Sequence, residues 1–159
     1  MLLALTAAGL TLSAGCGGSG FEDRTAEVTI SDRTTTYDVE SCGLDGDTAF
    51  VVARSSGGSV LQAVVGVADE EGTGVPEATG FTTVDDGVTL GAFGAEAWRR
   101  RGEDGPPPGS IEEADVTGSR IRLEAGAVPL EEDGTLPSGD VPAAEVSITI
   151  DSRCDAPED

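Results

Sequence analysis

The 159-residue chain contains no histidine, no lysine and no asparagine, and all nine of its basic residues are arginines. Without histidine there is no Ser-His-Asp or Cys-His catalysis and no histidine-ligated metal. Without lysine there is no Walker A loop and no Schiff base. The 30 acidic residues leave a net charge of −21, which excludes binding to nucleic acid or to an anionic membrane through charge.

Large apolar side chains are also sparse. From Cys16 onward, 30 of 144 residues are leucine, isoleucine, valine or phenylalanine, which is close to the share below which a charged chain stays unfolded. These residues gather in short runs, so the sequence still predicts one folded domain. Its core should be thin enough to need a covalent link.

The N-terminus has the features of an export signal. Residues 2–12 (LLALTAAGLTL) form an uncharged run of 11 residues, too short to span a bilayer but typical of a signal peptide. The run leads into LSAGC, which ends at Cys16 and resembles the bacterial lipobox. In a lipobox, the signal peptide is removed and the cysteine receives a diacylglycerol. The alternative is an ordinary secreted protein that is cut near Ala14 and keeps Cys16 as a spare thiol.

We therefore expect a signal peptide over residues 1–15, and a lipidated Cys16 with a flexible tether over residues 16–25. Two acyl chains are enough for stable anchoring. A tether of nine extended residues reaches at most ~30 Å. The sequence thus predicts a protein anchored to the cell membrane on its extracytoplasmic face, with the membrane as partner through the lipid on Cys16.

The two remaining cysteines, Cys42 and Cys154, form an even pair in a chain that we expect to be exported. This favours a disulfide, because exported proteins meet an oxidising environment. A link across so long a loop stabilises a fold by about 4–5 kcal/mol in the chain-entropy model. The alternatives are two buried free thiols, or a metal pair that lacks further soft ligands.

Apolar residues recur with the period of two that is typical of β-strands. The pattern is found in residues 26–30, 36–41, 88–92, 116–125 and 146–150. Residues 49–54 are more continuously apolar and predict a central strand. Residues 60–68 favour a strand over a helix, because they contain two valine pairs and an inner glycine.

Acidic, glycine-rich or proline-rich segments separate these runs and predict loops over residues 69–80, 102–110 and 131–142. No segment predicts a helix of ten residues. We therefore expect a single all-β domain over residues 26–154, an antiparallel β-sandwich or partly open barrel, followed by an acidic tail at 155–159.

Five segments share the layout of a known group of envelope proteins. They are LSAGC, AEVTISDRTTTYDVESC at 26–42, GVTL at 87–90, GSRIRL at 118–123 and EVSITIDSRC at 145–154. On these segments the chain resembles the mycobacterial 19 kDa lipoprotein antigen family. The absence of lysine and asparagine, whose codons are A-rich, is also typical of a high-GC actinobacterial genome. The resemblance implies a lipid on Cys16, a bridge between Cys42 and Cys154, and an antigenic or adhesive role without enzymatic activity.

The one basic cluster of the sequence consists of Trp98, Arg99, Arg100 and Arg101. Guanidinium groups beside an aromatic ring can hold a phosphate or a sugar acid, or stack on a glycan. The alternative is a strand end that neutralises acidic neighbours. The acidic clusters lack the spacing of a calcium loop and read as solvated loops, so we expect no metal and no cofactor.

Together these features predict a non-enzymatic surface interaction or antigen-like module of the cell envelope, whose protein or polymer partner the sequence leaves open. The alternative is a membrane-proximal carrier that holds a lipid, a glycolipid or a small solute in an apolar cleft. A cavity lined by apolar side chains would favour the carrier, whereas a well-filled core with only surface patches would favour the module.

Overall fold

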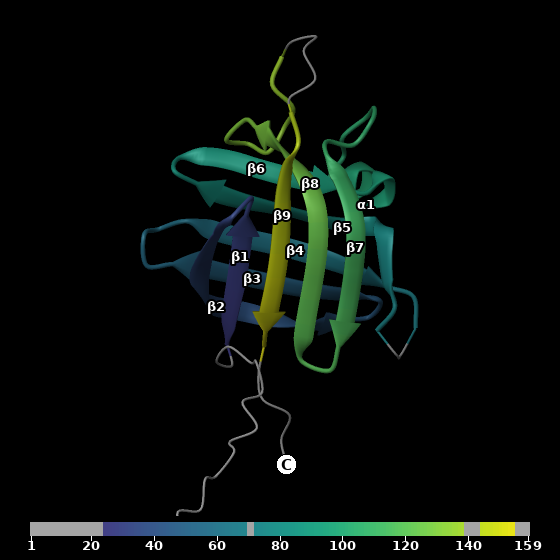
Figure 1. Ribbon diagram of the computed structural model, residues 1–159. Coiled ribbons are helices and arrows are strands. Elements are labelled where there is room, and N and C mark those ends of the chain that lie inside the picture. Colours follow the sequence, from purple (N-terminus) through teal and green to yellow (C-terminus); the bar gives the residue numbers. More distant parts are fainter. Residues whose placement is uncertain (1–23, 70–71, 139–143, 155–159) are drawn as a thin grey trace, which may run out of the picture.

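The computed structural model describes residues 24–69, 72–138 and 144–154, which form nine strands and one short helix (Figure 1). The elements are β1 (Thr25–Ile30), β2 (Arg33–Asp45), β3 (Thr48–Ser55), β4 (Val60–Val67), β5 (Gly74–Asp85), β6 (Val88–Phe93), α1 (Ala95–Arg100), β7 (Ser110–Thr117), β8 (Arg120–Leu130) and β9 (Val146–Arg153). The predicted signal peptide, Cys16, most of the tether and the acidic tail lie outside the described residues.

The strands form one antiparallel sheet that closes into a barrel. Their order is β6-β5-β4-β3-β2-β1-β9-β8-β7, and β6 also pairs with β8. This last pairing, from Thr89 with Leu130 to Gly91 with Val128, makes a ring of eight strands. The predicted all-β antiparallel domain is therefore confirmed, and of the two expected architectures it is a barrel, closed by this seam.

Strand β8 makes the closure possible by changing partners along one edge. Its first part, Arg120 to Gly126, pairs with β7, and its end, Val128 to Leu130, pairs with β6. In Figure 1, β1, β9, β8 and β7 run steeply across β3, β4, β5 and β6 behind them. Strands that cross in this way turn corners at bulges, and register shifts lie between Val39 and Ser41 and between Val64 and Gly66.

Side chains fill the interior of the barrel. The alternation along each strand sends one set inward, as predicted for Val28, Ile148 and Ile150, which are at most 1% exposed. The largest fully buried side chains are Tyr37, Phe81, Leu61, Leu123, Ile148 and Ile150. An eight-stranded barrel can be filled by its own side chains or can hold one small ligand, and here the inward side chains pack into one buried apolar cluster. This barrel thus has a packed core.

A disulfide joins Cys42 to Cys154, with 5.8 Å between the two Cα atoms. Thr25, the first residue of β1, pairs with both Asp38 and Arg153. Strand β1 separates β2 from β9 as far as Thr25. Past Thr25, no strand of the described chain lies between β2 and the residue that follows β9, and the disulfide joins them there. The bridge therefore lies where the chain enters the barrel.

One loop prediction was wrong in part, and one predicted strand is divided by a turn. Residues 74–80 belong to β5, although the segment is acidic and rich in glycine, because Gly74 and Gly80 lie where a Cβ would collide with Ala114 and Phe93. The predicted strand over 116–125 is interrupted by a turn at 118–119, because β7 ends at Thr117 and β8 begins at Arg120. Close packing against neighbouring strands determines the conformation of both segments. Such packing cannot be detected from the period of two in the sequence.

The helices of the described residues include none that is long and apolar enough to cross a membrane.

A groove on the outer face of the barrel

Apolar side chains lie on the outer face of β3 and β4, where alternation normally places polar residues. Val51 and Val65 point into the core. Phe50, Val52 and Val64 therefore face outward, and Val64 is 40% exposed. Together they form the floor of a groove, which we call the outer groove.

Helix α1 forms the wall of the outer groove. It starts after Gly94, where the chain passes so close to β5 that a Cβ would lie 2.0 Å from the main-chain oxygen of Pro76. Glu96 and Arg100 form an ion pair one turn apart, with 2.6 Å between Oε1 and Nη2. The helix ends at Arg100, and two residues later Gly102 has a φ of +86°, which suits glycine, and donates its N–H to the carbonyl oxygen of Arg99.

The buried side of α1 packs on a second, smaller apolar cluster formed by Phe93, Ala97, Trp98, Val128 and Leu130. The Phe93 and Trp98 rings meet at a centroid distance of 5.2 Å and an angle of 47°. Trp98 is 2% exposed, and its indole Nε1–H finds no partner among the described residues. This cluster fixes the wall at the seam where β6 meets β8.

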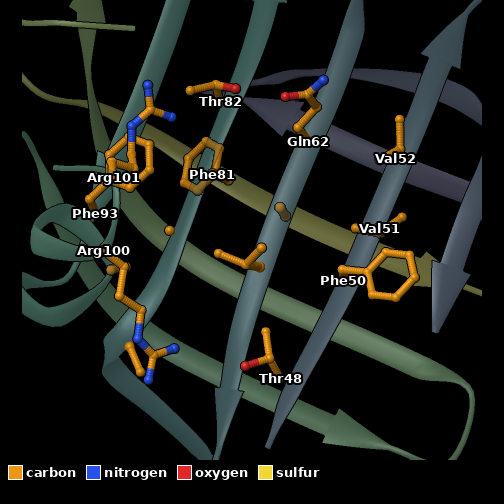
Figure 2. Close-up of a pocket in the computed structure, with 15 residues that line it drawn as sticks. Thr48, Phe50, Val51, Val52, Gln62, Phe81, Thr82, Phe93, Arg100 and Arg101 are labelled. Atoms are coloured by element: carbon orange, nitrogen blue, oxygen red, sulfur yellow. The ribbon is translucent and has the colours of Figure 1, made fainter. Parts of the chain in front are cut away.

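The outer groove has a volume of about 560 Å³. Phe50, Val52 and Val64 line it together with the polar side chains of Thr48, Gln62 and Thr82 and with two guanidinium groups. Figure 2 shows these guanidinium groups, of Arg100 and Arg101, at opposite ends of the groove, with Arg101 beside Thr82. No aspartate or glutamate belongs to the described lining.

Aromatic rings hold the side chain of Arg101. Its Cζ lies 5.0 Å from the centroid of Phe93 and 5.9 Å from that of Trp98. Its Nη2 donates to the main-chain oxygen of Asp133 at 3.4 Å. Hydrogen bonds from the hydroxyl and the N–H of Thr135 hold the pKa of Asp133 below its ordinary value, and the charge of Arg101 adds to this effect. The loop after β8 therefore helps to hold Arg101 at one end of the groove.

The structure separates the four predicted contact residues. Arg100 and Arg101 line the groove. Trp98 lies buried beneath it, and Arg99 is exposed outside the lining, with its Nε donating to the carbonyl oxygen of Ala95. The cluster lies in a short helix and at its C-terminal end rather than at a strand end. Gly94 and Gly102 flank this segment, and its buried residues are Ala97 and Trp98.

The prediction missed Phe50, Val52, Gln62, Val64 and Thr82. A signal was present, since the continuous run Phe50-Val51-Val52 and the pair Val64-Val65 place apolar residues on both faces of a strand. We interpreted the first run as a central strand. No second layer of the described chain covers the outside of the sheet at β3 and β4. The outward apolar side chains of β3 and β4 therefore form the floor of a groove and are not part of the core.

The described residues contain no group of three or more His, Cys, Asp or Glu side chains that could hold a metal ion. The acidic residues described in the acidic clusters are exposed, among them Asp45 at the end of β2 and Asp47 in the turn that follows.

Fold and groove together define a small, closed antiparallel β-barrel with a concave apolar surface on its outside. No family model matches the chain, and no curated protein matches its sequence.

Proposed function

We propose that this protein is a lipid-anchored module of the cell envelope that binds its partner through the outer groove and catalyses no reaction. The observation that carries the proposal is the position of the concave apolar surface. The interior of the barrel is filled by Tyr37, Phe81 and their neighbours, while Phe50, Val52 and Val64 line a groove on the outside. This arrangement favours a surface module over a carrier that encloses its ligand.

The chemistry of the groove supports binding rather than catalysis. Its lining offers apolar surface, the hydroxyls of Thr48 and Thr82, the amide of Gln62 and two guanidinium groups. A guanidinium stays protonated at any physiological pH, and general acid–base catalysis needs a group that exchanges its proton. A hydroxyl becomes a nucleophile only beside a base. These side chains are therefore suited to hold a partner.

The membrane anchor is supported by the sequence around Cys16, by the resemblance to the 19 kDa lipoprotein antigen family, and by the entry of the chain into the barrel. Strand β1 begins at Thr25, only nine residues after Cys16, and its first residue lies beside the strands that carry the disulfide. A barrel tethered so closely would stay near the membrane surface.

Mass spectrometry of the membrane-extracted protein tests the anchor. Trypsin cuts after Arg24, so the mature N-terminal peptide spans residues 16–24. We expect this peptide to carry the added mass of a diacylglyceryl group on Cys16, and residues 1–15 to be missing.

The control is the Cys16→Ala variant, which we expect to leave the membrane fraction. An unmodified Cys16 thiol in the membrane-extracted protein, or retention of the Cys16→Ala variant in that fraction, would contradict the proposed anchor.

A further inference from the structure

Arg101 differs from the arginines that the acidic surface neutralises. Five arginines of the described chain form ion pairs with carboxylates, namely Arg33, Arg54, Arg100, Arg120 and Arg122. Arg101 forms no such pair among the described residues, and its one hydrogen bond there goes to the main-chain oxygen of Asp133. Because a guanidinium carries five N–H donors, most of those of Arg101 are left for another partner.

The guanidinium of Arg101 is also held in place before any ligand arrives. It lies over the rings of Phe93 and Trp98, and both rings belong to the packed cluster under α1. A cation over an aromatic face keeps its edge free to donate hydrogen bonds. Because the side chain is already oriented, less conformational entropy is lost when it binds an anion.

This cation stands at the end of an apolar floor from which carboxylates are excluded. The chain has 30 acidic residues, yet the described lining of the outer groove contains none. Gln62 and Thr82 line the groove together with Arg101. The acidic residues Glu132 and Asp133 line an adjoining hollow and not the groove. The charge and the apolar surface of the groove are thus complementary to an amphiphilic anion.

We infer that the outer groove binds a single-chain lipid with an anionic head. The head accepts hydrogen bonds from Arg101, assisted by Gln62 and Thr82, and the acyl chain lies over Phe50, Val52 and Val64. This inference rests on the proposed function, because it takes the outer groove as the binding surface of the module. It adds the chemical class of the ligand.

The extent of the apolar surface favours a lipid chain over a protein partner. Four large apolar side chains of the described residues are well exposed, Leu44, Val64, Val88 and Leu136, and of these Val64 alone lies in the groove. A stable protein interface buries roughly 1,200 Å² or more around an apolar centre. A groove of about 560 Å³ is instead within the range of about 300–1,000 Å³ typical of small-molecule sites.

A titration with sodium laurate, below its micelle concentration, tests the inference. All strands and the disulfide lie within residues 24–154, so the exported chain from residue 17 onward contains the whole barrel and lacks the lipid anchor. Trp98 is the one tryptophan and touches Arg101 and Phe93, so its fluorescence reports binding. We expect saturable binding of one laurate per chain, and binding of the neutral 1-dodecanol that is weaker by about tenfold or more.

Three variants assign the site. Arg101→Gln should weaken laurate binding by about tenfold or more, since hydrogen bonds to a charged group are lost. Val64→Glu should abolish it, because a carboxylate then lies on the apolar floor. Arg99→Gln is the matched control, with the same charge change two residues earlier and outside the groove, and should bind as the native chain does. Unchanged thermal unfolding of each variant shows that it is folded.

The inference is overturned if laurate binding does not saturate or if 1-dodecanol binds equally well. It fails as well if Arg101→Gln and Arg99→Gln change laurate binding to the same extent. It is also overturned if a peptide of alternating leucine and glutamate binds with the same dependence on Arg101 while laurate does not. That result would assign the groove to a protein partner and leave the proposed module intact. The lipid on Cys16 is tested separately on the peptide 16–24, so the two failures are distinguishable.

Discussion

At the scale of single residues, the barrel is held by apolar side chains with a few polar groups paired inside. The Tyr37 hydroxyl lies 3.3 Å from that of Thr83, and both residues are at most 1% exposed. A buried hydroxyl without a partner costs free energy, whereas a pair that satisfies itself costs little. This contact therefore lets the largest side chain of the core stay inside the barrel.

The Tyr37→Phe variant tests the pairing. It should lower the free energy of unfolding by about 1 kcal/mol, because the Thr83 hydroxyl then remains buried alone. The double variant Tyr37→Phe with Thr83→Val should recover most of this loss, since both polar groups are removed. Urea unfolding measures both values. Equal stability of Tyr37→Phe and the native chain would show that the pair contributes nothing.

At the scale of elements, the outer groove depends on how closely α1 approaches β5. The main chain at Gly94 passes against Pro76 and Glu77 of β5, and the N–H of Gly94 donates to the carbonyl oxygen of Thr79 at 2.7 Å. Thr79 is fully buried, and its hydroxyl accepts from the N–H of Gly66 at the bulge of β4. These contacts connect α1, β5 and the bulge of β4, and they determine the position of the groove wall.

The Gly94→Ala variant should disturb this unit. Its Cβ would lie 2.0 Å from the main-chain oxygen of Pro76, which a strand in the sheet cannot move away freely. We expect a loss of about 1–3 kcal/mol in the free energy of unfolding, together with a shift in Trp98 fluorescence. Gly57→Ala is the control, because its Cβ meets nothing closer than the Ser55 Oγ at 3.7 Å. Similar unfolding curves for the two variants would contradict the close approach.

At the scale of the whole molecule, the disulfide secures a barrel that has few large apolar residues and a net charge of −21. Cys42 and Cys154 are 112 residues apart, so the bridge restricts most of the unfolded chain. Repulsion among the charges opposes the compact state. The bridge also joins β2 to the end of β9 at the point where the N-terminal segment enters.

Removal of the bridge should lower the melting temperature substantially. The chain-entropy model assigns about 4–5 kcal/mol to so long a loop, which corresponds to roughly 10–20 °C for a domain of this size. The variant Cys42→Ala with Cys154→Ala and the reduced native chain should melt at similar temperatures, and reductant should not affect the variant. A native chain whose melting curve is unchanged by reduction would show that the bridge contributes no stability.

The fold class, most strand positions and the cysteine pair could be predicted from the residues alone, because each depends on local period or composition. The alternation in residues 26–30 and 146–150 decides which side chains face inward, whatever the partner strands. The closure of the sheet, the strands β5 and β7, and the groove that Phe50, Val52 and Val64 line together with Arg101 became visible only in the folded chain. These features depend on contacts between residues distant in the chain, such as Gly91 with Val128 and Gly94 with Pro76, which leave no periodic signal.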